Sequence, residues 1–329
     1  MGYKISYEGG QLFASVRECG ENTVIFALNH SRKESTLAKF DFGGKYTALE
    51  KSYVGKAETE IVPLEITLRP NESVILVPTN KAVDAKKDFE VIVPKADYTV
   101  LSSDDNSLLL DCARYSVDGE NYSEAKYMSL LFGELLKKRY AGDLYLKYNF
   151  DVEVIPESLS FSFDMLNVKG IYVNGNSIEF ADNGNFVSDN ISKFVKAGNN
   201  EIVVKLNYWQ SEHVYYVLFG ENITEGLKNC LVYDSEIVPL VLKGDFAVYS
   251  KTGFKNGNTY NVKLGENFVI GKKQNKLTSF VECGYPFFGG KITLKQSFNA
   301  TKENVLLNLP FRWHTVRVFV NGKDLGLML

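Results

Sequence analysis

The sequence predicts a mainly β protein, built as tandem antiparallel β-sandwiches of the jelly-roll kind with one or two short helices. Short stretches of alternating apolar and polar residues recur along the chain, and Gly, Asn and Asp separate them. The 329 residues include 22 Phe and 19 Tyr, which excludes a disordered chain because so much apolar surface favours collapse. A chain of this length has room for two or three domains.

Residues 1–80 predict a small β-sandwich. Residues 24–28 form a strand that stops at the turn cluster Asn29-His30-Ser31. Residues 61–68 alternate and stop at Arg69-Pro70, and residues 73–77 follow as a strand that Pro78 bounds. The polar and charged residues 81–89 are predicted to be a linker.

Residues 90–258 predict one complete jelly roll with helical additions. Its predicted strands are residues 108–111, 144–150, 159–163, 171–173 and 201–206. Ser123 is the predicted N-cap of a helix whose apolar face holds Met128, Leu131, Leu135 and Leu136 and which the basic residues 137–139 close. A second short helix is predicted to begin near Glu221.

Residues 259–329 predict the start of a second jelly roll, with strands at 290–298, 305–309 and 316–320. The Val-Asn-Gly turn of residues 171–178 recurs at residues 318–326, and Asn-Gly is a strong signal for a tight hairpin turn. The first copy leads into a strand at residues 197–206, whereas the sequence stops after the second copy. We therefore expect a truncated last domain and a chain that is a fragment of a longer protein.

Composition and motifs exclude several functional classes. The formal net charge of −3 argues against nucleic acid as a partner, and no apolar run is long enough to span a membrane. The four cysteines are isolated, without the paired spacing of a zinc site, so free thiols in a reducing compartment are expected. No nucleophile-elbow, zinc-protease or phosphate-loop motif is present. The carboxylate pair Asp104 and Asp105 lies in a polar turn, so no catalytic residue is predicted.

Five segments stand out in order along the chain: SLLLDCARYSVDG at 107–119, RYAGDLYLKYNFDV at 139–152, YYVLFGEN at 215–222, VLKGDFAVYS at 241–250 and GYPFFGGKITLKQSF at 284–298. Taken in that order, they resemble the C-terminal region of large bacterial glycoside hydrolases of the α-L-rhamnosidase type, family 106-like. The Val-Asn-Gly turn with its following Gly-Asn-Asn-Glu-Ile strand is similar to the galactose-binding-like, sugar-binding jelly roll of family 2 glycoside hydrolases.

This resemblance implies a non-catalytic, carbohydrate-associated or scaffolding module of a glycoside hydrolase. The catalytic carboxylates of such enzymes lie on an upstream barrel, and this sequence has no βα repeat. The implied partners are a carbohydrate and that barrel domain. The expected location is the bacterial cytoplasm, because residues 1–20 lack a signal peptide. The alternative is a free-standing sugar-binding, adhesion or protein-interaction sandwich without an enzymatic partner.

Two clusters pair an aromatic platform with polar groups, as sugar sites do. The alternative is that Trp209 and Trp313 are packing residues, because large aromatic side chains commonly pack in cores or between domains. The candidate carbohydrate-binding residues are Tyr208, Trp209 and His213 in the first cluster, and Tyr285, Arg312, Trp313 and His314 in the second.

No metal or cofactor is predicted, with calcium kept as the weaker alternative. Asp182, Asn185 and Asp189 offer several oxygen ligands in one loop, which suits calcium. The spacing of an EF-hand is absent, however, and these residue types are also the usual residues of turns.

Overall fold

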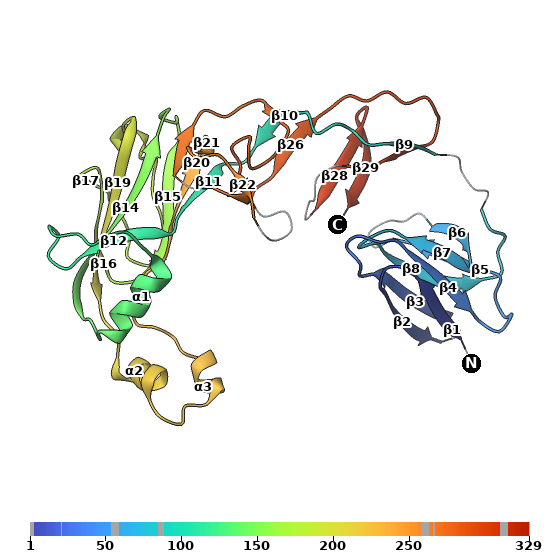
Figure 1. The fold of residues 1–329 in the computed structure, drawn as a ribbon, viewed down its shortest axis with the longest axis horizontal. Helices are drawn as coiled ribbons and strands as arrows, with labels where there is room; N and C mark the ends of the chain where they lie inside the picture. Colours follow the sequence, from blue (N-terminus) through green and yellow to red (C-terminus); the bar gives the residue numbers. More distant parts are fainter. Residues whose placement is uncertain are drawn as a thin grey trace. The chain divides into compact units, whose positions relative to one another are not determined.

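The computed structural model describes residues 3–20, 22–53, 59–84, 89–257, 263–265, 267–309 and 315–328 (Figure 1). The chain divides into two compact units. The first comprises Met1–Pro94 with Asn299–Leu329, and the second is Lys95–Phe298. The fold is mainly β, as the sequence predicts, and nearly all of its strand pairs are antiparallel.

The first unit contains a sandwich of two antiparallel sheets. Its core lies between them and includes the fully buried Ile25, Leu49, Leu68 and Leu76. One sheet has the order β1 (Lys4–Glu8), β4 (Thr36–Asp41), β7 (Glu65–Leu68), and the other β2 (Leu12–Cys19), β3 (Asn22–Asn29), β8 (Ser73–Thr79), β5 (Ala48–Ser52), β6 (Thr59–Pro63). The predicted strand 61–68 is therefore two strands, since the chain bends at Leu64 and continues in the other sheet.

The turn between β7 and β8 is held by one carboxylate. Glu72 accepts hydrogen bonds from the Arg69 backbone N–H at 2.7 Å and from the Tyr53 hydroxyl at 3.0 Å. Lys51 Nζ lies 3.8 Å from the same carboxylate. Burial by itself raises the pKa of Glu72, but these hydrogen bonds and the Lys51 charge together leave that pKa below its ordinary value.

The rest of the first unit holds two strand pairs. Strand β9 (Glu90–Ile92) pairs in parallel with β27 (Val305–Leu307), and β28 (Val316–Val320) pairs with β29 (Lys323–Met328). The hairpin turn between β28 and β29 has positive φ at Asn321 (51°) and Gly322 (82°), and its earlier copy has 47° at Asn174 and 82° at Gly175. The two Asn-Gly turns predicted from the sequence are thus confirmed, with the backbone signs of a type I′ hairpin.

The second unit is a larger sandwich. Its core includes the fully buried Tyr148, Phe161 and Leu242 between the two sheets. The four-stranded sheet has the order β11 (Asn106–Leu110), β20 (Leu240–Gly244), β15 (Leu159–Met165), β18 (Gly184–Val187). The facing sheet has the order β13 (Lys126–Tyr127), β12 (Cys112–Ser116), β14 (Gly142–Val152), β19 (Gly198–Tyr208), β16 (Val168–Val173), β17 (Asn176–Ser177).

Strands between residues 263 and 295, beyond the predicted boundary at 258, belong to this second unit. Strand β24 (Phe268–Gly271) pairs in parallel with β14 and antiparallel with β21 (Ala247–Ser250). Strands β25 (Lys276–Leu277) and β26 (Ile292–Lys295) flank β10 (Tyr98–Ser103), and the small pair β22 (Lys255–Asn256) and β23 (Lys263–Leu264) lies between β21 and β24 in sequence. The contacts therefore divide the chain near residues 94 and 298, which differs from the predicted boundary at 258.

The helices lie at one end of the larger sandwich. Helix α1 (Met128–Lys137) buries Met128, Leu131, Leu135 and Leu136, which confirms the predicted apolar face. The predicted N-cap is wrong, because the Ser123 hydroxyl accepts from the Tyr115 N–H and donates to the Glu124 carbonyl, in the loop before β13.

The segment between β19 and β20 carries two further helices. Helix α3 (Glu225–Asn229) is capped by Thr224, whose hydroxyl accepts from the Leu227 N–H, and it begins four residues after the predicted start at Glu221. Helix α2 (Glu212–Phe219) was not predicted, and a single 3₁₀ turn, η1, spans Ser192–Phe194. None of the helices in the described part of the chain has the length and apolar character needed to cross a membrane.

Candidate functional site

Tyr208, from the first predicted sugar-binding cluster, is a core residue. It ends β19 with its side chain fully buried. Its ring stacks on that of Tyr140 at a centroid distance of 6.2 Å and meets the edge of Phe132 at 6.4 Å. The Tyr208 hydroxyl accepts a hydrogen bond from Gln210 Nε2, and burial raises the pKa of Tyr208 to about 12. No face of this ring is open to a ligand.

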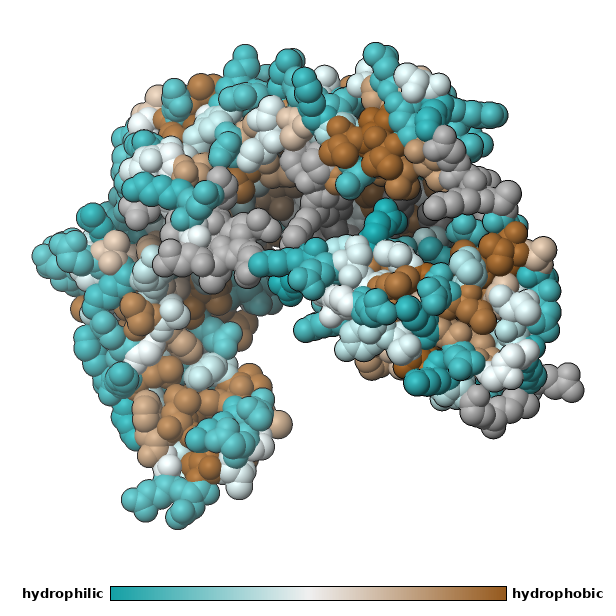
Figure 2. All heavy atoms as spheres, turned by 45° about the vertical axis from the view of Figure 1, so that its right-hand side comes forward, coloured by the Kyte–Doolittle hydropathy of each residue, from teal (hydrophilic) through white to brown (hydrophobic). Residues whose placement is uncertain are grey.

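Trp209 and His213 are on the surface of the same unit. Trp209 is 40% exposed just after β19, and His213 is exposed in the first turn of α2. Tyr216 and Phe219, both on α2, are also more than half exposed. Apolar side chains gather over this helical segment at the lower left of Figure 2. Trp209 and His213 stay candidates, as parts of an apolar helical surface.

The second predicted cluster is only partly described. Tyr285 is 3% exposed, and its ring meets Phe288 edge-on at 5.4 Å and Phe280 at 6.3 Å. Its buried hydroxyl has no hydrogen-bond partner within the described part of the chain. Burial removes this ring from a surface platform as well. The remaining members, Arg312, Trp313 and His314, lie outside the described residues.

The calcium candidates lie around β18. Asp182 is exposed in the preceding loop, Asn185 is exposed on β18 opposite Asp164, and Asp189 is exposed just after the strand. A cavity of about 340 Å³ beside this strand includes Asp189 and Glu179 in its lining. Across the ranges that the structure describes, no three acidic, His or Cys side chains group as metal ligands. Calcium binding here stays a prediction.

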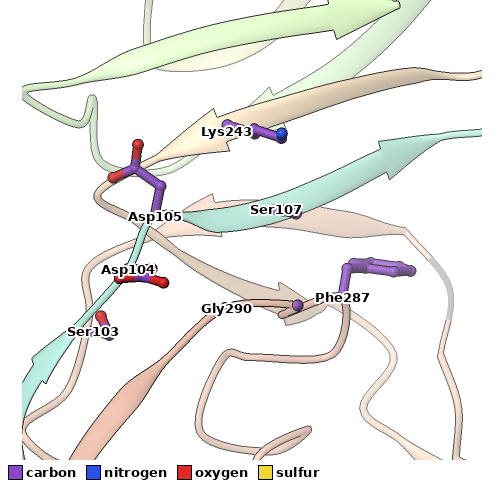
Figure 3. A pocket seen from close by; sticks show the side chains of 8 residues that line it. Ser103, Asp104, Asp105, Ser107, Lys243, Phe287 and Gly290 are labelled. Atoms are coloured by element: carbon purple, nitrogen blue, oxygen red, sulfur yellow. The ribbon is translucent and has the colours of Figure 1, made fainter.

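A larger cavity lies at the edge of the four-stranded sheet of the second unit. Its volume is about 580 Å³, within the roughly 300–1,000 Å³ of small-molecule sites. In Figure 3, Ser107 on β11 lies between Lys243 on β20 and the loop that carries Phe287 and Gly290. The lining residues are Ser103, Asp104, Asp105, Ser107, Lys243, Phe287, Gly289 and Gly290.

Strand alternation places the floor of this pocket. Ser107 and Lys243 are direct cross-strand partners in the β11–β20 register. Their neighbours Leu108 and Leu242 are buried in the core, so Ser107 and Lys243 point to the opposite, solvent face. Cβ atoms of direct partners are about 4.5–5.5 Å apart, so the two side chains leave the sheet next to each other in the lining of the pocket.

A buried asparagine brings the loop of residues 284–290 to the sheet. Asn106 is fully buried, and its Nδ2 donates to the Phe246 carbonyl at 2.9 Å and to the Gly284 carbonyl at 2.7 Å. The Gly284 carbonyl also accepts from the Val248 N–H at 2.9 Å. Gly284 has φ of +96°, and a Cβ there would lie 2.5 Å from the Cβ of Ala247. Only glycine fits this close approach without strain.

The end wall of the pocket joins Asp104 to the chain after the loop. The Asp104 N–H donates to the Lys291 carbonyl at 2.9 Å, and the Lys291 N–H donates to Asp104 Oδ2 at 2.8 Å. A Cβ at Gly290 would lie 2.8 Å from the Cβ of Asp104. Phe287 is packed edge-on against Phe268 at 5.0 Å. Backbone pairing and aromatic packing therefore hold the walls of the pocket.

Three polar groups of the pocket are unpaired. In the described structure, the Asp105 carboxylate, the Lys243 ammonium and the Ser107 hydroxyl make no hydrogen bond or ion pair. Some other charges on this unit are paired within the protein. Lys147 lies 3.0 Å from Glu201, for example. The pocket therefore offers an acceptor, a donor and a hydroxyl whose hydrogen-bonding capacity is still available.

A neighbouring lysine is already neutralised. Lys273 Nζ bonds Ser103 Oγ at 3.0 Å and lies 2.7 Å from Asp245 Oδ1. Lys243 is therefore the one free cation of the lining residues.

Ser107, Lys243 and Phe287 lie in three of the five segments that resemble glycoside hydrolases, those at 107–119, 241–250 and 284–298. Asp104 and Asp105 were interpreted from the sequence as turn residues only. The resemblance was the sole signal that pointed to these segments, and nothing local in the sequence shows that they meet.

Comparisons with known proteins identify no family. No protein-family model matches the chain, and no curated protein matches it. Among solved structures, a rhamnosidase from Novosphingobium sp. PP1Y is 16% identical with a TM-score of 0.28, over 73% of this chain and 25% of the rhamnosidase. A β-D-glucuronidase of Dictyoglomus thermophilum is 18% identical with a TM-score of 0.31, over 51% of this chain and 32% of the enzyme.

A β-glucuronidase of Ruminococcus gnavus has the same identity and TM-score as the Dictyoglomus enzyme, over 51% of this chain and 36% of that one. The chain thus spans a quarter to about a third of the length of these glycoside hydrolases.

Proposed function

We propose that this chain is a non-catalytic, carbohydrate-binding or scaffolding module of a glycoside hydrolase that acts on α-L-rhamnosides or related glycosides. One observation carries the proposal: three of the five segments that resemble such enzymes meet at the pocket beside β11 and β20. Segments far apart in the sequence thus supply one site.

The groups in this pocket suit a sugar. A sugar ring has an apolar C–H face and a rim of hydroxyls, and each hydroxyl both donates and accepts hydrogen bonds. The Phe287 ring offers an apolar surface, and Asp105 and Lys243 offer an acceptor and a donor. Ser107 does both from the floor. Sites for small molecules combine apolar and aromatic lining with a few placed polar groups in this way.

The non-catalytic part of the proposal rests on the placement of the carboxylates. Glycoside hydrolysis uses two carboxyl groups on either side of the scissile bond, about 5–10 Å apart. Asp104 and Asp105 are consecutive residues at one end of the pocket, and Asp104 is engaged by the Lys291 N–H. The parent enzyme's chemistry is therefore proposed to lie on a partner barrel domain, with carbohydrate as the ligand shared between the two.

Isothermal titration calorimetry of the full chain with methyl α-L-rhamnoside tests this function. Lys243→Met and Phe287→Ala should each weaken binding by about tenfold or more, the effect of one lost charge-assisted hydrogen bond or apolar contact. Lys169→Met is the matched control, because Lys169 is exposed on β16 in the other sheet and makes no ion pair in the described structure.

Three results would overturn the proposal. Sugar binding that neither pocket variant changes, or no binding to any sugar of a broad glycan panel, would refute the site. Hydrolysis of 4-nitrophenyl α-L-rhamnoside by the chain alone, lost in Asp105→Asn, would refute the non-catalytic role.

A further inference from the structure

We propose that the pocket beside β11 and β20 selects neutral sugars over uronic acids, through the unequal charges of its lining. This inference rests on the proposed function and adds the ligand class. The lining holds two carboxylates, Asp104 and Asp105, against the single free ammonium of Lys243. The nearby Lys273 does not change this balance, because it is paired with Asp245.

Each ligand class meets these charges differently. An anionic sugar pairs with Lys243 but places a third negative charge beside Asp104 and Asp105. A cationic ligand suits the carboxylates but is repelled by Lys243. A neutral ring carrying adjacent hydroxyls satisfies both, because each hydroxyl donates to a carboxylate and accepts from the ammonium. Repulsion between like charges is a common source of specificity against a competing ligand.

The geometry favours a pair of adjacent hydroxyls. Ser107 and Lys243 are direct cross-strand partners, so their side chains stand next to each other on the solvent face of the sheet. Asp105 immediately precedes β11, the strand that carries Ser107. Adjacent hydroxyls that reach the floor of the pocket therefore meet the Ser107 and Lys243 side chains, and the Asp105 carboxylate lies toward one end of the same pocket. Phe287 on the opposite wall is left for the C–H face of the ring.

Gly289 offers a way to block the pocket without changing its charge. An added Cβ at this position meets no atom within 4 Å, and Gly289 is not among the positive-φ glycines. Gly289→Val should therefore fold normally while its side chain takes up space in the pocket. Gly289→Ala, with a smaller side chain, is its graded control.

The experiment compares two probes by calorimetry on the full chain: methyl α-L-rhamnoside and methyl β-D-glucuronide carboxylate. Wild type should bind the neutral probe about tenfold or more tightly than the acidic one, a difference typical of one unfavourable charge contact. Asp105→Asn should narrow that ratio, since it removes one of the repelling charges. Gly289→Val should weaken both probes, and Lys169→Met should change neither.

The outcomes separate the inference from the proposed function. Equal or tighter binding of the glucuronide by wild type, abolished by Lys243→Met, overturns the neutral-sugar inference and leaves carbohydrate binding at this pocket intact. A neutral-over-acidic ratio that Asp105→Asn leaves unchanged also overturns it, because the carboxylate would not be the source of discrimination. Absence of binding for both probes and for the glycan panel refutes the proposed function itself.

Discussion

Replacing Asn106 by Ala should loosen the pocket and destabilise the second unit together. The side chain of Asn106 is fully buried at the start of β11 and makes three hydrogen bonds. Two are donated by Nδ2 to the carbonyls of Phe246 and Gly284, and Oδ1 accepts one from the Ser107 N–H at 2.9 Å. These bonds link β11 to the chain before β21 and to the loop that carries Phe287.

The expected magnitude follows from the groups left behind. Alanine cannot replace any of these bonds, so the Phe246 carbonyl and the Ser107 N–H each lose a partner, and the Gly284 carbonyl keeps its bond from the Val248 N–H. A typical intramolecular hydrogen bond contributes about 1 kcal/mol net, and an unsatisfied buried group costs about 1–3 kcal/mol. Because relaxation or entering water recovers part of the loss, we expect Asn106→Ala to lower the free energy of unfolding by about 2–4 kcal/mol.

Urea unfolding and hydrogen exchange measured by mass spectrometry on the full chain test this value. Hydrogen exchange assigns the loss of stability to the second unit, where peptides covering residues 106–110 and 284–290 should lose protection from exchange. Asn185→Ala is the matched control, since Asn185 is exposed on β18 and its substitution should stay within about 0.5 kcal/mol. A loss below about 1 kcal/mol with unchanged protection at residues 284–290 would refute the role given to Asn106.

Three further predictions concern other parts of the molecule. The pKa of Glu72 is depressed in the folded state. The ionised Glu72 carboxylate therefore stabilises the fold above its unfolded pKa of about 4.3, and this stabilisation is lost as pH falls through the folded-state pKa. Glu72→Gln should flatten the pH dependence of the free energy of unfolding, measured in urea, in that acidic range. Gly175→Ala should lower the free energy of unfolding by about 1–2 kcal/mol, which a lower urea midpoint would show. Gly175 has a φ of 82° and no atom lies within 4 Å of the added Cβ, so the cost is backbone strain alone. Cys230 is exposed and should react with iodoacetamide well before the buried Cys283. Burial by itself raises the pKa of Cys283, but hydrogen bonds with Thr278 and Ser279 together leave that pKa below its ordinary value. Mass spectrometry of the native protein checks the order of labelling, and faster labelling of Cys283 would contradict it.

Sequence patterns that depend on neighbouring residues predicted strands, turns and a helix face correctly. The alternation at residues 144–150 and 201–206 appears as β14 and β19, whose inward residues are buried. The Asn-Gly pairs adopt the left-handed backbone that a two-residue hairpin requires. The apolar face of α1 is the one predicted, because residues three and four apart share one side of a helix.

The errors in the candidate site arose where long-range packing overrides local chemistry. Tyr208 has the residue type of a sugar platform, but the inward position on β19 places it in the core. Its neighbour Trp209 lies beyond the end of the strand and is exposed. Helix α2 begins at Glu212, within the stretch that holds the first candidate cluster, where the sequence predicted no helix.

The sequence by itself determined the mainly β class, the positions of most strands, the Asn-Gly turns and the buried face of α1. Each depends on residues within a few positions of one another. Tertiary structure decided which strands share a sheet, where the two units divide, and that Asp105, Lys243 and Phe287 line one pocket. The physical reason is that strand pairing and the bonds of Asn106 join residues more than a hundred positions apart, which no local pattern encodes.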